Sequence, residues 1–335
     1  MPSVDIVRAN PLDHADGIKE LFVAHERPEF PEFFDRAYPS AVENGGKSWI
    51  GVDPDGRPVL HVALFRQRFA FGDRTLVGGL LANLMAATSH RTFIPALSLM
   101  RRLVADSRTE GEIDFLYGDP NPQAWALLKT VGFTPVGTLQ RFMLPLADRR
   151  WYVDVAFRAY RAILRLRAPW SRVVAVAHEA HRYDADVLER PSGSAPAMRP
   201  FRPVALYRQR LPGYPSTSDY WFTLHRRGAA TPSSAAALVR QSDDGVAKLI
   251  SVSRDPSLPM SAIIPPIARA LRRAGSTRFW IATLADTHFA GELKRAGFVP
   301  REESGPVAAL ALTEPGAAAL RAASTWEITD LDCDR

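Results

Sequence analysis

Two short segments place basic and acidic side chains where a predicted strand ends and a predicted helix begins. His90 and Arg91 follow extended sequence that ends near Ala87, and Tyr117 and Asp119 close or follow the run EIDFLYG. A strand end that leads into a helix is a usual place for functional side chains. An arginine fork binds phosphate or carboxylate groups, and a histidine or a carboxylate can move protons. The two segments therefore predict an anion site beside candidate catalytic groups.

These side chains also have structural alternatives. His90 is equally an ordinary loop histidine, and Asp119 and Asn121 stand where the helix NPQAWALLKTVGF needs an N-cap. Trp125 on that helix either lines a channel or packs in the core, and a tryptophan at helical spacing is more typical of a core. Both interpretations stay open on the sequence alone.

Common catalytic and metal-binding motifs are absent from the sequence. No histidine pair has metal-ligand spacing, and neither a G-x-S-x-G elbow nor a Walker loop is present. The single cysteine, Cys333, excludes an intramolecular disulfide and a cysteine-based zinc cluster. Metallohydrolase, serine hydrolase and NTPase activities are therefore excluded, and no metal is predicted.

Composition indicates a folded protein with one large or two ordinary domains. The chain has 335 residues, of which 46% are hydrophobic and 23% charged, with 42 Lys and Arg against 36 Asp and Glu. No helix-turn-helix, zinc-finger or RNP-like pattern accompanies the arginines, so nucleic acid is not an expected partner. The N-terminal segment lacks a signal-peptide pattern and no long apolar run occurs, so we expect a cytoplasmic protein that does not span a membrane.

Hydrophobic periodicity predicts a mixed α/β layer structure. In the first half we expect a strand at 3–9, a helix at 11–24, a hairpin at 47–69, extended sequence to 87, a helix that begins near Pro95, a strand at 112–118 and a helix at 121–133. Residues 146–200 interrupt this pattern with a basic, aromatic helix and a linker rich in Pro, Ser and Arg. The pattern then resumes with a hairpin around 243–245, a proline-opened helix, a strand at 278–284 and a helix that ends at 298.

The two halves repeat one another. Residues 121–133 match residues 286–298 at an offset of 165, through the pairs Leu128/Leu293, Lys129/Lys294, Gly132/Gly297 and Phe133/Phe298. The dipeptide Ile94-Pro95 matches Ile264-Pro265 at an offset of 170. Two spaced matches with similar offsets predict two structurally similar halves.

The repeated segment resembles a conserved block of the GNAT acyltransferase family. Asn121, Ala124, Gly132 and Phe133 fit its spacing of Asn, Ala, Gly and Phe, whereas Leu128 and Leu293 stand at the position of the family's tyrosine. The resemblance covers most of the chain. It implies an α/β fold of two tandem GNAT-like domains, at 1–145 and 201–335, with the helical linker insertion at 146–200 between them.

The family resemblance implies transfer of an acyl group from acyl-CoA to an amine. The phosphate-binding pattern corresponds to RTFIPA, in which Arg91 and Ala96 fit and Ile94 replaces a glycine. Together with Thr92, Asn121 and Trp125, these residues are the expected CoA-binding set, and His90, Tyr117 and Asp119 are the catalytic candidates. The corresponding segment of the second half carries Arg254 but no glycine, so the first half is the expected CoA-binding half.

Residues 25–40 are the expected cover of the acceptor site. Glu29 suits a cationic amine, and Phe33, Phe34 and Tyr38 suit an apolar tail; the alternative is a solvated, loosely helical lid. The basic aromatic helix at 151–172 has the composition of a membrane-surface helix, and its alternative is an amphipathic helix packed across the two halves.

Three functions follow as alternatives. The first is acylation of a long-chain amino lipid, similar to bacterial ceramide synthases, at the inner face of the cytoplasmic membrane, with acyl-CoA or an acyl carrier protein as donor. The second is acetylation of a small polar amine such as an amino sugar, suggested by the tail WEITDLDCD, which resembles the ending of double-GNAT polysaccharide acyltransferases. The third is a ligand-binding module without catalysis.

Overall fold

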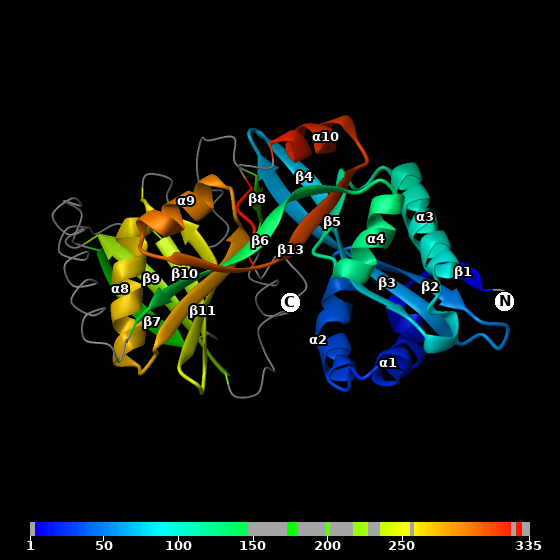
Figure 1. Cartoon of the computed structure of the whole chain (residues 1–335), viewed down its shortest axis with the longest axis horizontal. Coiled ribbons are helices and arrows are strands. Elements are labelled where there is room, and N and C mark those ends of the chain that lie inside the picture. Colours follow the sequence, from blue (N-terminus) through cyan, green and yellow to red (C-terminus); the bar gives the residue numbers. More distant parts are fainter. Residues whose placement is uncertain are drawn as a thin grey trace.

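A computed structural model describes residues 4–146, 173–179, 198–201, 217–226, 235–254, 258–322 and 326–329. They form a mixed α/β structure around a 13-stranded sheet that runs through both halves of the chain (Figure 1). The predicted fold class is therefore confirmed. The expected helix at 151–172 lies outside the described residues, as do residues 330–335 of the tail.

The first half follows the predicted order of elements, with small shifts at their ends. Its elements are β1 (Asp5–Ala9), η1 (Pro11–His14), α1 (Ala15–Val23), α2 (Phe30–Glu43), β2 (Lys47–Val52), β3 (Pro58–Phe71), β4 (Arg74–Ala86), η2 (Thr88–His90), α3 (Phe93–Glu110), β5 (Phe115–Gly118), α4 (Pro122–Thr130) and β6 (Thr134–Pro145). The segment 25–40, expected as a cover of the acceptor site or as a solvated, loosely helical lid, consists mostly of the regular helix α2. The lid alternative is wrong in being solvated, because Phe30, Phe34 and Tyr38 recur at helical spacing and are buried.

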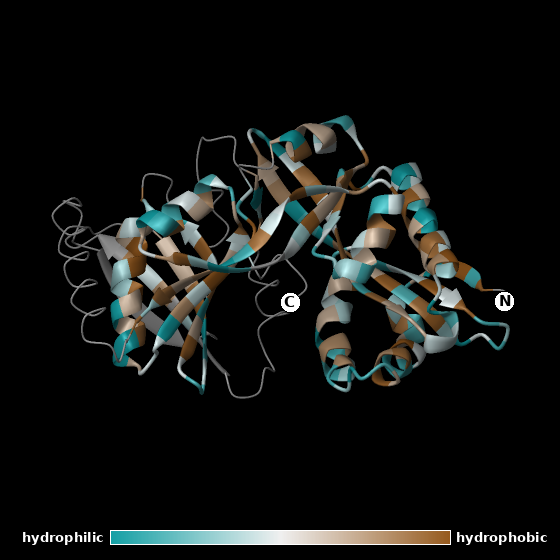
Figure 2. Cartoon of the chain, in the orientation of Figure 1, coloured by the Kyte–Doolittle hydropathy of each residue, from teal (hydrophilic) through white to brown (hydrophobic). Residues whose placement is uncertain are grey.

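The second half repeats the pattern of strand, strand, helix, strand, helix and strand. Its elements are β7 (Val173–Glu179), β8 (Arg199–Pro200), β9 (Thr217–Arg226), β10 (Ala235–Ser242), β11 (Val246–Arg254), α8 (Met260–Arg273), β12 (Arg278–Leu284), α9 (His288–Arg295), β13 (Val299–Ala311) and α10 (Glu314–Arg321). Figure 2 shows hydrophobic and hydrophilic residues alternating around α3 and α8, as expected for helices with one face on a sheet.

The proline match between the halves is wrong by about one helical turn. Pro95 is the third residue of α3, whereas Pro265 and Pro266 lie inside α8, which begins at Met260, 167 residues after Phe93. Proline is tolerated in a first turn because its missing N–H would be unpaired there, so it marks a helix start only approximately. The true offset of these helices lies close to the 165 residues of the glycine match.

The repeated Gly-Phe pair ends a helix in each half by the same hydrogen bonds. Gly132 has φ of 97° and Gly297 has φ of 99°, a left-handed conformation that favours glycine. The Phe133 N–H donates to the Leu128 carbonyl over 3.1 Å, and the Phe298 N–H donates to the Leu293 carbonyl over 3.0 Å. The repeated pattern therefore encodes a Schellman helix end, with the buried phenylalanine packed beneath it.

The last strands of the two halves are interleaved at the centre of the sheet. β13 pairs with β5 on one side and with β6 on the other, and β6 pairs with β12. The final strand of each half therefore lies against a strand of the other half, and the two cross at the waist of the molecule in Figure 1. The predicted boundaries near residues 145 and 201 stay a prediction, because 147–172, 180–197 and 202–216 lie outside the described residues.

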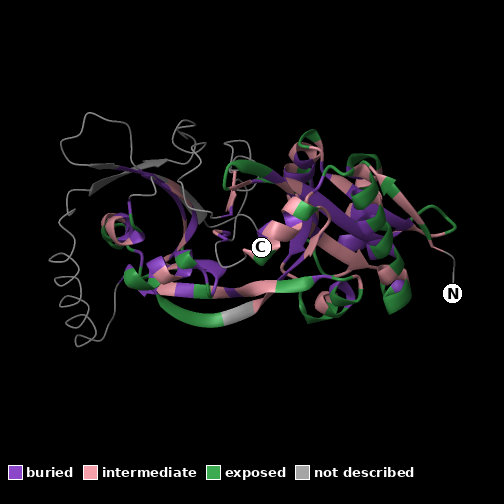
Figure 3. Cartoon of the chain, turned by 90° about the horizontal axis from the view of Figure 1, so that it is seen from above, coloured by how far each residue is buried: buried purple, intermediate pink, exposed green. Residues whose placement is uncertain are grey.

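The C-terminal segment 326–329 packs into a core that both halves share. In Figure 3 the buried residues, in purple, follow the sheet through both halves. Trp326 is fully buried, its ring lies 5.7 Å from that of Phe115, and its Nε1 donates to the Ala319 carbonyl over 3.2 Å. The segment therefore closes the structure across its middle.

We expect Trp326→Ala to lower the free energy of unfolding by about 3 to 5 kcal/mol, because it removes a buried aromatic ring and leaves a cavity. Urea unfolding measures the change. Trp125→Ala is the matched control, since Trp125 is only partly buried against α3 and should cost less. Equal losses in the two variants would contradict the structural role of the segment.

Candidate active site

The candidate site begins where two parallel strands separate. β4 pairs with β5 only from Gly78 to Leu80, yet β4 continues to Ala86. The β4 residues beyond the last pair, from Asn83 to Ala86, are partly exposed. A backbone edge that has left its neighbour offers N–H and C=O groups to an extended ligand. The split between β4 and β5 is the first feature of the site.

The exposed N-terminus of α3 lies directly after β4 and η2. Thr92 occupies the N-cap position but makes no capping hydrogen bond, and no acidic residue stands in the first turn. Phe93 is 50% exposed and Ile94 64% exposed, so the first turn faces outward. Unpaired N–H groups and the helix dipole make such a terminus favourable for an anion. Of the predicted CoA-binding set, Arg91, Thr92, Ile94 and Ala96 lie here together.

His90 is buried at the base of this loop. Its Nδ1 lies 2.9 Å from the Ser89 hydroxyl, while Nε2 has no hydrogen-bond partner among the described residues. The neighbouring Thr88 hydroxyl lies 3.4 Å from Nε2 of His25, which follows α1. The turn between α1 and α2 therefore contacts the loop before α3.

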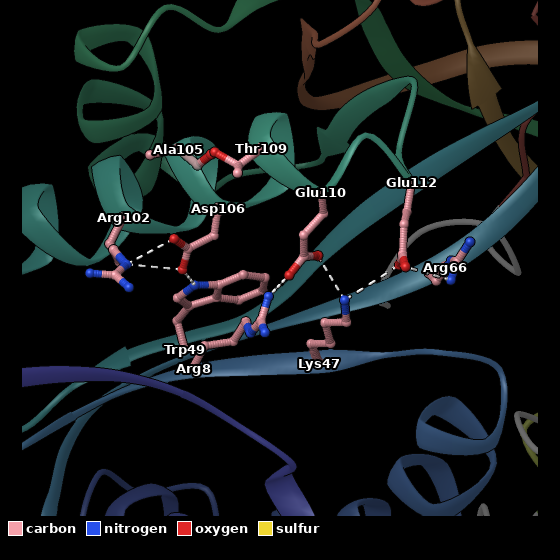
Figure 4. A network of polar contacts seen from close by, with 10 residues as sticks. All are labelled: Arg8, Lys47, Trp49, Arg66, Arg102, Ala105, Asp106, Thr109, Glu110 and Glu112. Carbon is pink, nitrogen blue, oxygen red and sulfur yellow. Dashed lines mark hydrogen bonds and ion pairs between the residues drawn. The ribbon is translucent and has the colours of Figure 1, made fainter.

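Polar contacts at the C-terminal half of α3 fix this helix to the sheet (Figure 4). Trp49 on β2 donates to Asp106 over 2.8 Å, and Lys47 lies 2.7 Å from Glu110, which also pairs with Arg8 on β1. Burial raises the pKa of Asp106, but hydrogen bonds from Trp49 and Arg102 outweigh it and hold the pKa below its usual range. These contacts hold the C-terminal half of α3 against β1 and β2.

A bulge on β4 contacts a buried histidine of β3 that the sequence did not reveal. Asn83 has φ of 55°, and its carbonyl accepts a hydrogen bond from Nδ1 of His61 over 3.0 Å. Nε2 of His61 lies 3.1 Å from the Ser48 hydroxyl, and Nδ2 of Asn83 donates to the Tyr38 hydroxyl over 3.1 Å. The register around the bulge runs His61↔Met85 and then Ala63↔Ala82. Asn83 and Leu84 together therefore face a single residue of β3.

The His61 imidazole is neutral in the folded protein. Burial lowers its pKa from 6.5 to about 4, against the opposing effect of the hydrogen bond to Asn83. A carbonyl only accepts hydrogen bonds, so Nδ1 carries the proton and Nε2 accepts from Ser48. This fixes the tautomer of the ring.

The free energy of unfolding should therefore decrease as the pH falls through the range in which His61 is protonated in the unfolded chain but not in the folded one. The folded pKa lies below the unfolded one, so the contribution is complete above about pH 6.5 and is lost as the pH falls to about 4. The expected loss is about 3 kcal/mol. Urea unfolding at several pH values measures it, and His61→Asn should remove this part of the slope. Equal slopes in the two proteins would show that His61 does not contribute.

The predicted residues after β5 are divided between the core and the edge of the site. Tyr117 is fully buried, with its ring 5.6 Å from that of Phe69, whereas Asp119 is partly exposed beyond the strand end. Asn121 caps α4 by accepting from the Ala124 N–H over 2.8 Å, and Trp125 is partly buried against the core under α3 and α4. Asp119 and the α3 terminus thus lie at the same edge of the sheet, since parallel strands end together.

The predicted acceptor residues separate in the same way. Phe34 and Tyr38 are buried on α2, where their rings stack 4.1 Å apart. Phe33 is partly buried beside them, and Glu29 is exposed, where a hydrogen bond from Arg27 holds its pKa below the usual range. Phe33 and Glu29 therefore have exposed surface, and the other two aromatic residues belong to the core.

The corresponding split in the second half is occupied by the chain itself. β11 pairs with β12 only from Val246 to Lys248, and both strands continue beyond. Thr283 on β12 donates to the Ile328 carbonyl over 2.7 Å, and Thr329 donates to the Ile250 carbonyl on β11 over 2.7 Å. The segment 326–329 thus bonds to both separated strands.

The first residues of the helix after β11 are more buried than those of α3. Leu258 and Met260 bury the start of α8. Arg254, at the end of β11, donates to the Leu258 carbonyl over 2.8 Å and pairs with Glu292, and both side chains are at least nine-tenths buried. The arginine of this half is therefore engaged inside the protein.

No group of three or more His, Cys, Asp or Glu side chains in the described residues is placed to hold a metal ion. None of the described helices is long and apolar enough to cross a membrane.

Comparison with known proteins identifies the fold. No family model matches the chain, and no curated protein matches its sequence. A GCN5-related N-acetyltransferase from Kribbella flavida aligns at TM-score 0.59 and 14% identity, over 94% of this chain and 73% of that one. A probable N-acyltransferase from Enterococcus faecalis V583 aligns at 0.65 and 10%, over 94% and 74%. A tandem GNAT protein from the clavulanic acid biosynthesis pathway aligns at 0.53 and 12%, over 92% and 99%. The chain therefore has the GNAT fold, repeated in two halves.

Proposed function

We propose that this protein is an N-acyltransferase that moves an acyl group from acyl-CoA to a primary amine. The observation that carries the proposal is the split between β4 and β5, which opens beside the exposed N-terminus of α3. An extended thioester arm fits between separated strands, and its diphosphate fits the unpaired N–H groups of the helix. The fold comparison supports acyl transfer as the reaction class.

The reaction needs orientation and a polarised carbonyl more than a strong base. The amine nitrogen attacks the thioester carbon, the new C–N bond forms, the C–S bond breaks, and the amine proton leaves to water while the thiolate takes one up. We propose that an N–H group on the part of β4 that β5 does not pair stabilises the oxyanion. Leu128 is buried on α4 at the position of the family's tyrosine, so we propose His90 or Asp119 as the proton carrier. Full burial of Tyr117 makes it the weaker candidate.

The first half is the proposed active half. Its split and helix terminus are exposed, while segment 326–329 bonds across the second split and Arg254 is paired with Glu292. We therefore propose one acyl-CoA site per chain.

The proposed reaction has two candidate classes of acceptor amine. A long-chain amine, in a ceramide synthase-like reaction at a membrane surface, is supported by the composition of 151–172. The structure adds only the partly buried Phe33 to that case, since Phe34 and Tyr38 belong to the core. A small polar amine is the second candidate, supported by the resemblance of the tail WEITDLDCD to the ending of double-GNAT polysaccharide acyltransferases. An acyl carrier protein remains the proposed alternative donor.

Thiol release from acyl-CoAs of increasing chain length, with and without amines, tests the proposal. The amine panel holds sphingoid bases and amino sugars, and the donor panel includes an acyl carrier protein thioester. We expect saturable release that requires an amine, and the preferred chain length selects the acceptor class. CoA binding without turnover would favour the ligand-binding module, and no CoA binding at any length would overturn the proposal.

A further inference from the structure

The bulge on β4 orients one peptide group at the strand split. The Asn83 carbonyl points to His61 on β3, and no peptide bond in the described residues is cis. The C=O and N–H of a trans peptide point in opposite directions, so the N–H of Leu84 points away from the His61 ring. β3 and β5 flank β4 on opposite sides, and β5 has already left the ladder at this level.

This peptide is held by two separate side chains. The His61 side chain donates to the Asn83 carbonyl, and the Tyr38 hydroxyl accepts from Nδ2 of the Asn83 side chain. Both side chains are completely buried. A left-handed non-glycine residue costs free energy of about 1 to 3 kcal/mol and persists only where its surroundings hold it. The His61 ring is locked in turn by Ser48 and by the Phe22 ring, whose centroid is 5.7 Å away.

The second half has a bulge at the same level but not the same histidine. The register between β10 and β11 slips at Ile250, and the first pair beyond the slip is Leu238↔Ser251. Leu238 therefore occupies the place that His61 has beside Met85 in the first half. The Ile250 carbonyl accepts instead from Thr329 of the C-terminal segment. The buried imidazole thus accompanies the half with the exposed split.

We propose that His61 is a positioning residue for acyl transfer, which fixes the Asn83–Leu84 peptide so that the Leu84 N–H donates to the thioester carbonyl. The inference rests on the proposed function and assigns His61 no contact with substrate. Its effect should appear in the transition state, where negative charge develops on the carbonyl oxygen, rather than in binding of acyl-CoA.

Two substitutions of His61 separate its two hydrogen bonds. His61→Asn keeps an amide N–H near the position of Nδ1 and so keeps the bond to the Asn83 carbonyl. His61→Gln places its amide near Nε2, toward Ser48, and loses that bond. We expect His61→Gln to lower kcat about 100-fold with KM for acyl-CoA changed less than about 3-fold, and His61→Asn to retain kcat within about 5-fold.

Trp326→Ala is the control for folding. It lowers Tm by leaving a cavity in the core but keeps the His61–Asn83 bond in place, so its kcat should stay near wild type at a temperature below its Tm. The infrared stretch of a 13C-labelled thioester carbonyl gives an independent readout. It should shift to lower frequency on binding to the wild type, and much less on binding to His61→Gln.

The outcomes separate the positioning role of His61 from the proposed acyl-transfer activity. Equal losses of kcat in His61→Gln and His61→Asn that follow Tm would overturn the positioning role, as would a wild-type kcat in His61→Gln. An absence of thiol release in the wild type, with all acyl-CoAs and amines, is the failure of the proposed function instead.

Discussion

Ile94→Asp is expected to raise KM for acyl-CoA by about 10- to 100-fold, with little change in kcat. Ile94 is the second residue of α3 and is 64% exposed at the proposed diphosphate site. A carboxylate there repels the diphosphate and competes for the same N–H groups. An acidic residue in a first turn favours the helix dipole, so folding should not suffer. Initial rates against acyl-CoA concentration measure the effect.

The matched control is Ser261→Asp, which places the same charge at the second residue of α8. We expect its KM to stay within about 2-fold of wild type, because the second half is not the proposed CoA-binding half. Calorimetric titration should give one CoA per chain for the wild type and for this control. A loss of binding in Ser261→Asp with normal binding in Ile94→Asp would assign the site to the other half.

Separating the two halves at a cut within 147–172 is expected to abolish folding of each. Alone, the first half lacks β13, which pairs with β5, and the second half lacks β6, which pairs with β12. Each fragment would expose unpaired strand edges and apolar surface, a condition that favours aggregation. Circular dichroism melts and solubility measure the result, and we expect no cooperative transition from either fragment.

Coexpression of the two fragments provides the control. Together they hold every strand of the central pairing, so they should form a soluble complex that unfolds as one unit. A fragment that folds alone, with β6 returned to β5 of its own half, would show that the interleaving is not required.

Local patterns predicted the elements well where one helix face or one turn decides the structure. Strand β12 has the predicted bounds. Gly132 and Gly297 end their helices in the left-handed backbone conformation, which glycine adopts most readily. The aromatic residues of α2 could have been placed in the core as well. Phe30, Phe34 and Tyr38 recur at intervals of four, which is the spacing of a buried helix face.

Pairings between distant segments could not be predicted from such patterns. The alternation of hydrophobic and polar residues in β6 and β13 would be the same whichever half each strand joined. The sequence therefore does not predict the interleaving. His61 sits among apolar residues of β3, and its partners Ser48 and Asn83 come from neighbouring strands. The tail segment WEITDLDCD begins at Trp326. The packing of the Trp326 ring against Phe69 and Phe115 depends on the assembled sheet and could not be predicted.

The interleaved strands also set the order in which this chain can fold during synthesis. β5 ends at Gly118, but its partner β13 begins only at Val299. At ribosomal rates of about 5 to 20 residues per second, the edge of β5 waits roughly 10 to 40 seconds for that partner. During this interval the nascent first half presents an incomplete sheet, a state that chaperones recognise by its exposed apolar surface. Codon usage between these two strands, and the availability of such chaperones, should therefore govern how much active protein a cell obtains.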